Sequence, residues 1–447
     1  AEQRANAGGD QFQVDYTQNL NLEGKTTFDG YDKLERQAKL VAIIRDGAEV
    51  SQVAGGEKVS LVLDNTPFYA NSGGQVGDTG VIELNGARFE VQDCRKNGEH
   101  FLHVGVVVEG EFTAGAEVAC RVDASIRLAT ALNHSATHLA HAALRKVLGE
   151  HVAQKGSLVD SQRLRFDFAH FDAMTAEELA AVEAMVNAQI RANTPVVTEL
   201  CTMDEAKAKG AMALFGEKYG DTVRVLTMGA DNFSMELCGG THVERTGDIG
   251  LFKIVSEAGI SAGVRRIEAV TGSAAVEYVQ KQNALVGQLA AQLKASPDAV
   301  ADKVAALMQA QKESAKEIAA LNAKLAGLSV IQWLDDAVTV GDLKVLAKVA
   351  GGLDSASLPD TVDQLKNKLG KAVVLLANKE GDKTSLIVGV TKAESKQIKA
   401  GDLLKHVAGE LGGKGGGRPD MARGACPASD ALESVVASVP QWVQSNL

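Results

Sequence analysis

Short runs in which apolar and polar residues alternate dominate the chain from residue 26 to residue 123. Lys58–Leu63 and Gly80–Leu84 are examples of such runs. Turn-forming dipeptides separate them, at Asp46-Gly47, Asn85-Gly86 and Asn97-Gly98. Alternation of period two, interrupted by tight turns, is typical of antiparallel strands with one buried face. The pattern predicts a small β-barrel or β-sandwich.

Helical and strand-like patterns are mixed between residues 124 and 272. Ala131–Leu148 has helical periodicity. Thr175–Glu178 carries the Thr-x-x-Glu pattern of a capping box, which predicts a second helix that ends near Asn193. Two strand-like segments accompany these helices, Leu164–Phe168 and Gly263–Glu268. This part of the chain is therefore expected to be an α+β core.

Residues 273–328 predict two helices, interrupted at Ser296-Pro297-Asp298, where serine is a favoured cap and proline a favoured first helical residue. The second helix has a 4-3 repeat with two polar positions in its middle. The repeat consists of Val300, Val304, Leu307, Gln311, Ser314, Ile318, Leu321, Leu325 and Leu328. Such a repeat is typical of a coiled coil. It fits a helical hairpin within one chain as well as a zipper that joins two copies.

Strand-length and helix-length apolar runs alternate in the last part of the chain, residues 329–447. The runs are Leu343–Val349, Thr361–Leu369, Ala372–Ala377, Ser385–Val390 and Lys399–Leu411. They predict a C-terminal α/β domain. Residues 1–25 are polar and predict a loose lead-in segment. The expected fold class is thus a multidomain α+β protein, with a small β-barrel (26–123), an α+β core (124–272), a helical hairpin (273–328) and the α/β domain (329–447).

Composition and charge limit the kinds of protein to which this chain can belong. The chain has 447 residues, enough for several domains, and 45% of them are hydrophobic. A net charge of −11 argues against a protein that coats nucleic acid, but it allows a local basic patch. The five cysteines are scattered and odd in number, which fits free thiols in the cytoplasm rather than a disulfide framework. We find no signal peptide and no apolar run of membrane-spanning length. The first residues read as the middle of a longer sequence, so the chain is expected to be a fragment.

Two separate motifs supply four good zinc ligands. His134 and His138 are four residues apart within a predicted helix, so both imidazoles leave the same face. Cys238 and His242 flank a pair of glycines, which suits a tight loop that turns a thiolate and an imidazole toward one point. Together the motifs predict one Zn²⁺ per chain. The alternative is a helix with ordinary buried histidines beside a buried cysteine, and His141, on the same helix face, could compete as a ligand.

A second glycine pair, Gly73-Gly74, lies within Thr66–Asp78 in the predicted barrel. Adjacent glycines permit close approach of the backbone to another group. A bend at a barrel corner is an equally good interpretation.

The segment Gly412–Gly417 has five glycines in six positions and is followed by Arg418. With Lys414 it predicts a loop whose backbone approaches an anion. It is not a Walker loop, because no Gly-Lys-Ser/Thr sequence ends it. Residues 361–424 contain twelve Lys and Arg against seven Asp and Glu, a local excess of five positive charges. RNA contact by Lys414, Gly415, Gly416, Gly417 and Arg418 is the favoured interpretation, and a solvated basic face is the alternative.

The order of several motifs resembles the C-terminal half of bacterial alanyl-tRNA synthetases. The motifs are Thr66–Asp78, Asn133–Leu144, Gln154–Ser157, Ala213–Asp221, Met235–His242, Gly263–Gly272 and Gly412–Ala422. The His and Cys motifs alone also resemble the editing domain of threonyl-tRNA synthetases and free-standing editing proteins. The barrel, the hairpin and the terminal glycine segment favour the alanyl family. One departure is Ala422–Cys426, where the family usually has another glycine pair.

The resemblance implies an editing reaction, the hydrolysis of tRNA(Ala) mischarged with serine or glycine. In the whole protein it also implies ATP-dependent attachment of alanine to tRNA(Ala), by a core outside this chain. An apolar alanine pocket rejects an added hydroxyl or a smaller residue poorly, so a second, hydrolytic site is needed. Thr137 and Gln154 are the candidates for contacting the serine hydroxyl. Zinc, held by His134, His138, Cys238 and His242, is expected to position the substrate rather than to activate water, because four protein ligands close the site.

Two other classes of protein could contain such a zinc-ligand set. A zinc peptidase is disfavoured because Ser135, and not glutamate, follows His134, so the His-Glu-x-x-His pattern is missing. A non-catalytic, zinc-stabilised module that binds tRNA would have the same ligands with a purely structural Cys238 loop. Hydrolysis of mischarged tRNA distinguishes editing from both.

Overall fold

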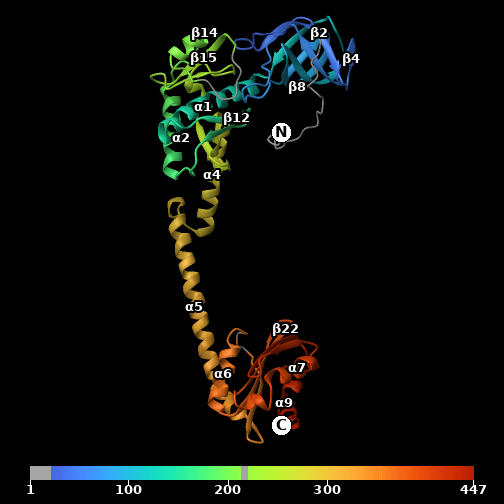
Figure 1. Ribbon diagram of the computed structural model, residues 1–447, viewed down its shortest axis with the longest axis vertical. Helices are drawn as coiled ribbons and strands as arrows, with labels where there is room; N and C mark the ends of the chain where they lie inside the picture. Colours follow the sequence, from blue (N-terminus) through green and yellow to red (C-terminus); the bar gives the residue numbers. More distant parts are fainter. Residues whose placement is uncertain (1–21, 213–219, 352, 354) are drawn as a thin grey trace. The chain divides into compact units, whose positions relative to one another are not determined.

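The computed structural model describes residues 22–212, 220–351, 353 and 355–447 (Figure 1). The predicted lead-in lies mostly outside these residues, as does most of the Ala213–Asp221 motif. The chain divides into two compact units, Ala1–Leu285 and Val286–Leu447. Both contain sheets and helices, so the predicted multidomain α+β class is confirmed. Among the described helices, none combines the length and the apolar character needed to cross a membrane.

The first unit begins with a closed six-stranded barrel. Of the two predicted architectures, a β-barrel and a β-sandwich, the structure has the barrel. Its strands follow the order β11-β7-β8-β9-β5-β2, and β11 pairs with β2 to close the sheet. They are β2 (Glu35–Arg45), β5 (Lys58–Leu63), β7 (Gly80–Leu84), β8 (Ala87–Asn97), β9 (His100–Glu109) and β11 (Glu117–Val122). Short strands flank it, namely β1 (Thr27–Phe28), β3 (Ala48–Val50), β4 (Gln52–Ala54), β6 (Asn65–Thr66) and β10 (Glu111–Thr113). Alternate residues of β8, such as Phe89 and Val91, enter the core.

Two predicted turns join neighbouring strands of the barrel. Asp46 and Gly47 link β2 to β3, and Asn85 and Gly86 link β7 to β8. All four residues have positive φ angles, from 46° at Asn85 to 89° at Gly86. Asn-Gly and Asp-Gly are favoured there because both central residues of a two-residue hairpin turn adopt the left-handed region.

The α+β core of the first unit packs two helices on a four-stranded antiparallel sheet of order β12-β13-β18-β17. The strands are β12 (Gln154–Val159), β13 (Leu164–Ala169), β17 (Phe252–Ser261) and β18 (Val264–Thr271), and the helices are α1 (Ala124–Leu148) and α2 (Ala176–Ala192). The predicted capping box of α2 is confirmed, since the Thr175 hydroxyl accepts from the Glu178 amide and the Glu178 carboxylate accepts from the Thr175 amide.

A second, three-stranded antiparallel sheet completes the core and carries the cysteine motif at its end. It consists of β14 (Val197–Thr202), β15 (Thr222–Met228) and β16 (Ser234–Leu237), in that order. Helix α3 (Met203–Ala208) packs on it, and the short 3-10 helix η2 (Thr246–Ile249) follows the motif. Cys238 therefore comes directly after the last residue of β16.

Two helices occupy the region predicted as a hairpin, α4 (Gly272–Leu293) and α5 (Val300–Trp333). The 3-10 turn η3 (Pro297–Ala299) separates them, with Pro297 at its first position. Ser296 precedes the turn, but its side chain makes no capping hydrogen bond. The apolar positions of the 4-3 repeat from Val304 onward are exposed, from 42% at Val304 to 61% at Leu328, whereas Val300 is half-buried.

The second unit is built on one six-stranded sheet of order β19-β20-β21-β22-β24-β23, in which only β20 and β21 are parallel. The strands are β19 (Val338–Val340), β20 (Leu343–Val349), β21 (Ala372–Glu380), β22 (Lys383–Val390), β23 (Lys414–Gly417) and β24 (Met421–Pro427). Its helices are α6 (Leu358–Leu369), α7 (Ala400–Glu410), α8 (Leu432–Ala437) and α9 (Val439–Ser445), with 3-10 turns η4 (Leu334–Asp336) and η5 (Glu394–Lys396).

The central strand β21 is buried on both faces. Val373 and Leu375 pack with α7, α8 and α9 on one side, whereas Val374 and Leu376 pack with α6 and the end of α5 on the other. A strand covered on both faces has no polar positions to alternate with apolar ones, which explains the unbroken apolar run from Ala372 to Ala377.

The glycine-rich segment is a strand, so the prediction of an anion-binding loop is wrong in its conformation. Lys414–Gly417 forms the edge strand β23 and pairs with β24, which contains the atypical stretch Ala422–Cys426. A Cβ atom on Gly415 would lie 2.7 Å from Cδ2 of Leu404 and 2.8 Å from Cα of Gly424. The glycines therefore permit close packing of the edge strand against its neighbours.

Candidate metal centre

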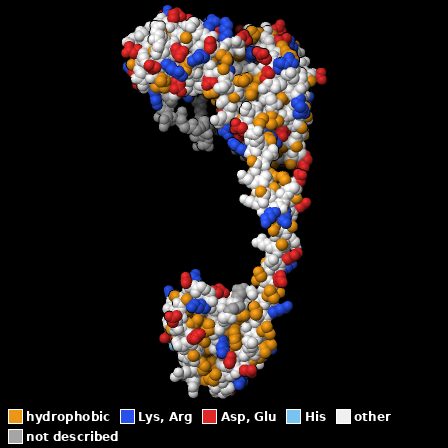
Figure 2. Space-filling model, turned by 180° about the vertical axis from the view of Figure 1, so that it is seen from behind, with side chains coloured by type: hydrophobic (Ala, Val, Ile, Leu, Met, Phe, Trp, Pro, Cys, Tyr) orange, Lys and Arg blue, Asp and Glu red, His pale blue; other side chains and the backbone are white. Residues whose placement is uncertain are grey.

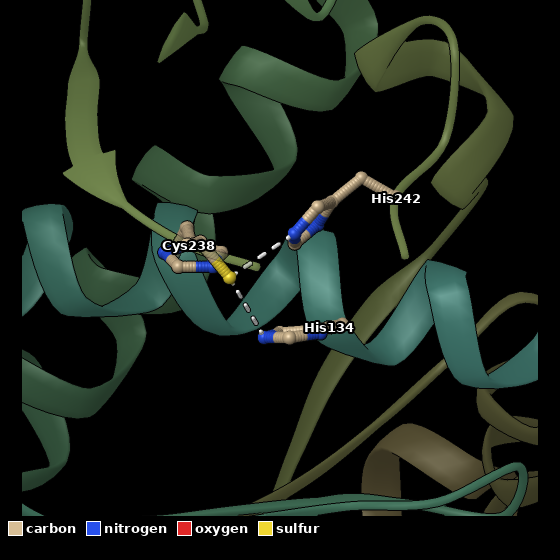
Figure 3. A group of neighbouring side chains, drawn as sticks. His134, Cys238 and His242 are labelled. Atoms are coloured by element: carbon tan, nitrogen blue, oxygen red, sulfur yellow. Dashed lines mark hydrogen bonds between the residues drawn. The ribbon is translucent and has the colours of Figure 1, made fainter. Parts of the chain in front are cut away.

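Four side chains from two distant parts of the first unit meet at one point. His134 and His138 lie on successive turns of α1, and Cys238 and His242 lie on the loop that follows β16. Their ligand atoms all lie within 4.8 Å of one another. The Cys238 Sγ atom is 3.5 Å from Nε2 of His134 and 3.3 Å from Nε2 of His242. Figure 3 shows the helix and the loop presenting these side chains to each other. This set of three imidazoles and one thiolate is a common ligand set for zinc.

Glycine is required at one of the two positions between Cys238 and His242. A Cβ atom on Gly240 would lie 2.1 Å from Cε1 of His134, whereas a Cβ atom on Gly239 would meet nothing within 4 Å. Gly240 thus lets the loop pass directly over the imidazole of His134. The Gly240 amide also donates to the Cys238 sulfur at 3.4 Å.

Each of the three imidazoles is held through its Nδ1 atom. Nδ1 of His134 donates to Oε1 of Gln75 at 2.7 Å, and Nδ1 of His138 donates to Oε2 of Glu236 at 2.6 Å. Nδ1 of His242 is hydrogen-bonded to Oγ of Ser135 at 3.2 Å. The Nε2 atoms are therefore left to face the cluster, and that of His138 is buried without a hydrogen-bond partner. Outer hydrogen bonds of this kind orient histidine ligands in metal sites, so the residues present fit a metal ion.

The electrostatics of the cluster favour a cation. Burial alone raises the pKa of the Cys238 thiol, but the imidazoles of His134, His138 and His242 hold that pKa well below its usual range. Burial likewise raises the pKa of Glu236, but His138 and His141 outweigh it and lower that pKa to about 2. The site thus contains a buried thiolate and a buried carboxylate. A divalent metal ion would supply the charge that compensates them.

Burial lowers the pKa of His242 to about 3, which keeps its imidazole neutral and able to bind a metal. Burial also lowers the pKa of His138, but the Cys238 thiolate and the Glu236 carboxylate outweigh it and raise that pKa to about 10. A metal ion bound at Nε2 of His138 would take the place of the proton that these two anions attract.

His141, which the sequence left open as a competing ligand, lies outside the cluster of four. Its Nδ1 atom donates to Oε1 of Glu236 at 2.8 Å, so its contact with the site runs through that carboxylate. It occupies the turn of α1 after His138 and packs against the ring of Phe166.

A cavity of about 540 Å³ lies beside the cluster. The candidate metal-binding loop, which runs from Cys238 to His242 and is called the metal-binding loop below, contributes Thr241 and His242 to the cavity wall. The other lining residues come from the barrel side, from α1 and from the remainder of the core, and they are Tyr31, Asp32, Leu34, Ala124, Arg127, Leu128, Ala131, Val196, Thr198, Arg224, Val243, Glu244 and Asp248. Its volume falls in the range of small-molecule sites in proteins, about 300–1,000 Å³.

Tyr31 and Arg224 hold the metal-binding loop at the edge of this cavity. The Tyr31 hydroxyl donates to the carbonyl oxygen of Gly239 at 2.7 Å, and Nη1 of Arg224 donates to that of Gly240 at 2.8 Å. The Arg224 guanidinium lies 4.0 Å from the centre of the Tyr31 ring, within the range of a cation–π contact. The sequence indicated neither residue, because their role depends on contacts between distant segments.

The segment with Gly73 and Gly74 is a site contact. A Cβ atom on Gly74 would lie 2.6 Å from the carbonyl oxygen of Ser157, so glycine lets this segment approach β12 closely. Gln75 then reaches the metal-binding loop, where its Oε1 accepts from the Thr241 amide at 2.9 Å and its Nε2 donates to the Thr241 hydroxyl at 2.8 Å.

A buried ion pair fixes the barrel to α1. The guanidinium of Arg127 on α1 forms two hydrogen bonds of 2.9 Å through Nε to the carboxylate of Asp78. It also donates to the carbonyl oxygens of Gly30 at 2.6 Å and Pro67 at 2.8 Å. Asp78 and Arg127 are both buried. This contact places the end of the barrel over the first turns of the helix that carries His134.

Thr137 and Gln154, the two residues expected to contact the substrate, do not line the cavity beside the cluster. The hydroxyl of Thr137 donates to the carbonyl oxygen of Asn133, one turn earlier in α1, at 2.8 Å. Gln154 is the half-buried first residue of β12. Neither is among the described residues that line the cavity.

The candidate RNA-binding residues lie together at the edge of the sheet in the second unit. Lys414, Gly416 and Gly417 are exposed on β23, where Gly415 is half-buried. Arg418, in the turn to β24, is exposed and lies 3.4 Å from the carboxylate of Asp420. Figure 2 shows Lys and Arg side chains among Asp and Glu on the visible face of this unit. The face of this unit that is visible in Figure 2 is therefore not uniformly basic.

Three family models match parts of the chain. Residues 1–126 match the model described as tRNA synthetases class II (A), and residues 223–268 match the threonyl and alanyl tRNA synthetase second additional domain. The latter range contains Cys238 and His242. Residues 342–445 match the DHHA1 domain. A solved structure, the C-Ala domain from Aquifex aeolicus alanyl-tRNA synthetase, is 30% identical and covers 24% of this chain and 97% of its own, with a TM-score of 0.23.

Curated relatives match nearly the whole chain. An alanine–tRNA ligase of Saccharophagus degradans is 54% identical over 99% of this chain and 50% of its own length. Those of Chromohalobacter salexigens and Pseudomonas entomophila are 53% and 51% identical, over 100% and 98% of this chain and 51% and 50% of their own lengths. The chain is therefore homologous to alanine–tRNA ligases over nearly its whole length, and it spans about half the length of the curated relatives it matches.

Proposed function

We propose that this chain hydrolyses the ester bond of tRNA(Ala) that carries serine or glycine. The observation that supports this most directly is that His242, one of the four clustered side chains, also lines the cavity, next to Thr241. A cavity beside a polar, metal-binding cluster is where a small reacting group can be held away from bulk water. The likeness to alanine–tRNA ligases supports aminoacyl-tRNA as the substrate class in this proposal.

The metal in this proposal is one Zn²⁺ per chain, held by His134, His138, Cys238 and His242. When bound, it would supply a positive charge that attracts and orients polar groups of the substrate. Gln75 and Ser135 keep two of the imidazoles in the orientation that the ligand set requires.

Discrimination against alanine requires a partner for the serine hydroxyl that alanine leaves unpaired. Thr137 and Gln154 remain the proposed partners, in accordance with their motif positions. The α1 backbone occupies the Thr137 hydroxyl as a donor, so this oxygen is left to accept a hydrogen bond. Thr241, which lines the cavity, is a further polar residue beside the cluster.

In the second unit, Lys414, Gly415, Gly416, Gly417 and Arg418 are proposed to contact the tRNA backbone. As an edge strand, β23 offers backbone amides and the Lys414 side chain to phosphate oxygens, and Arg418 in the following turn offers a second cation. Self-association of two copies is proposed through the apolar positions of α5, which are exposed, or through the C-terminal domain.

A longer protein that contains this chain is proposed to attach alanine to tRNA(Ala) with ATP.

The alternative function, a non-catalytic zinc-stabilised module that binds tRNA, has no need of a cavity beside the ligands. The experiment that separates the two functions incubates the zinc-loaded chain with Ser-tRNA(Ala) and Ala-tRNA(Ala), and follows loss of each aminoacyl group. Preferential deacylation of Ser-tRNA(Ala) supports editing. Binding of tRNA with no deacylation above the spontaneous rate would favour the module.

A further inference from the structure

One carboxylate joins two histidines of α1 beneath the metal cluster. Oε2 of Glu236 accepts from Nδ1 of His138 at 2.6 Å, and Oε1 accepts from Nδ1 of His141 at 2.8 Å. All three side chains are almost fully buried, with exposed fractions of 2%, 2% and 1% for Glu236, His138 and His141. Only His138 belongs to the cluster of four ligands.

We propose that Glu236 and His141 are positioning residues of the metal centre, with His141 acting on His138 through Glu236. A hydrogen bond at Nδ1 fixes both the tautomer and the ring angle of a histidine that binds metal through Nε2. Glu236 provides that bond for His138. His141 occupies the second oxygen of the carboxylate and so prevents the group from turning away.

The position of Glu236 in the chain lets it link the strand before Cys238 to helix α1. The residue lies on β16, two positions before Cys238, and its carboxylate crosses to two successive turns of α1. The carboxylate therefore also ties the strand that ends at the cysteine to the helix that carries the histidines. A shift of the strand would move Cys238 and the support of His138 together.

A packing role for His141 is the competing explanation, because its ring centre lies 5.0 Å from that of Phe166. The two roles differ in what a substitution must preserve. Packing requires an apolar group of similar size, whereas positioning requires an N–H at the place of Nδ1. Asparagine presents its amide N–H near the position of histidine Nδ1, and leucine has no donor.

The inference rests on the metal site of the proposed function, but its test needs no tRNA. Zinc affinity of the full chain is measured by competition with a chromophoric chelator, for the wild-type protein and for Glu236→Gln, His141→Leu and His141→Asn. Loss of an outer hydrogen bond weakens metal binding by about 10- to 100-fold, which we expect for Glu236→Gln and His141→Leu. His141→Asn is expected to retain affinity within about threefold of wild type, since the donor is kept.

The absorption spectrum of the Co²⁺-loaded proteins gives a second readout, because it reports the ligand geometry and not only the stability of the fold. We expect a changed visible spectrum for His141→Leu and a wild-type spectrum for His141→Asn.

If Glu236→Gln does not fold, the comparison of His141→Leu with His141→Asn is sufficient to test the proposal. Equal affinities and spectra for the leucine and asparagine variants would overturn the proposal in favour of packing. Failure of the wild-type chain to bind zinc would overturn it together with the proposed metal site, whereas zinc binding without deacylation would affect the proposed function alone.

Discussion

The hydroxyl of Tyr31 donates a 2.7 Å hydrogen bond to the carbonyl oxygen of Gly239, a residue 208 positions later in the chain. Tyr31 lies just beyond strand β1, and Gly239 lies within the metal-binding loop. The bond thus joins the barrel part of the first unit to the loop between Cys238 and His242. It makes the barrel a part of the metal site and not only its neighbour.

Replacing Tyr31 with phenylalanine should loosen this loop while leaving the four ligands in place. A hydrogen bond of this kind contributes about 0.5–1.5 kcal/mol, so zinc release to a chelator should become about 2- to 10-fold faster. Stopped-flow measurement of zinc release checks this. Tyr278→Phe, on α4, is the matched control and should release zinc at the wild-type rate. Equal rates for both variants would show that the Tyr31 bond does not hold the loop.

The two glycines of the metal-binding loop provide a second test. An alanine at residue 240 would place its Cβ atom 2.1 Å from Cε1 of His134, whereas the same change at residue 239 meets nothing within 4 Å. Gly240→Ala should therefore displace the loop or the imidazole and weaken zinc binding by about tenfold or more. Gly239→Ala should bind zinc as wild type does. The comparison is made by zinc titration, and similar affinities for the two variants would contradict the loop geometry described here.

A buried histidine in the barrel predicts a pH dependence of stability that is independent of the metal site. Burial lowers the pKa of His103 to about 4, and its neutral ring is held by Thr66, which donates to Nε2, and by the carbonyl oxygen of Leu61, which accepts from Nδ1. As the pH falls, the unfolded chain protonates His103 near pH 6.5, whereas the folded chain protonates it only near pH 4. Stability is therefore fully present above pH 6.5 and is lost as the pH falls toward 4, by about 3 kcal/mol in total.

The measurement is urea unfolding of the wild type and of His103→Gln between pH 4 and pH 7. The variant lacks this proton uptake, so its unfolding free energy should fall less steeply in that interval. Parallel curves for the two proteins would show that the pKa of His103 is not lowered in the fold.

Binding of tRNA should depend on salt through the second unit. Each phosphate contact that is lost reduces the slope of log K against log salt by about 0.7–0.9. We expect Lys414→Ala and Arg418→Ala each to reduce the slope by about this amount, with zinc content unchanged. Lys312→Ala, on α5, is a control that removes the same charge elsewhere. A slope that is unaltered in the Lys414 and Arg418 variants would remove these residues from the interface.

The sequence predicted those features whose signal is local. The spacing of His134 and His138 on a helix, and of Cys238 and His242 across two glycines, identified the cluster, because each pair lies within a few residues. Turn dipeptides likewise predicted the hairpins of the barrel.

Features that depend on contacts between distant segments were missed. Tyr31 and Arg224 acquire their roles only when the barrel, the sheets and α1 come together, and nothing in their immediate neighbours marks them. Gln75 and Glu236 lie within two of the motifs, but their hydrogen bonds to the histidines of α1 depend on the same long-range contacts. The conformation of Lys414–Gly417 was predicted wrongly for a related reason. Glycines carry no alternation of apolar and polar side chains, so a glycine strand can be recognised only from the strand it pairs with.

The central claim is that the metal cluster and the adjoining cavity form a deacylation site. It is tested most directly by the rate of Ser-tRNA(Ala) deacylation under single-turnover conditions, for the zinc-loaded wild type and for the Cys238→Ala, His242→Ala double variant, with Ala-tRNA(Ala) as the matched substrate. We predict rapid loss of serine with the wild type, little loss of alanine, and spontaneous rates with the double variant. Deacylation of Ser-tRNA(Ala) by the double variant at the wild-type rate, or no deacylation by the zinc-loaded wild type, would contradict the claim.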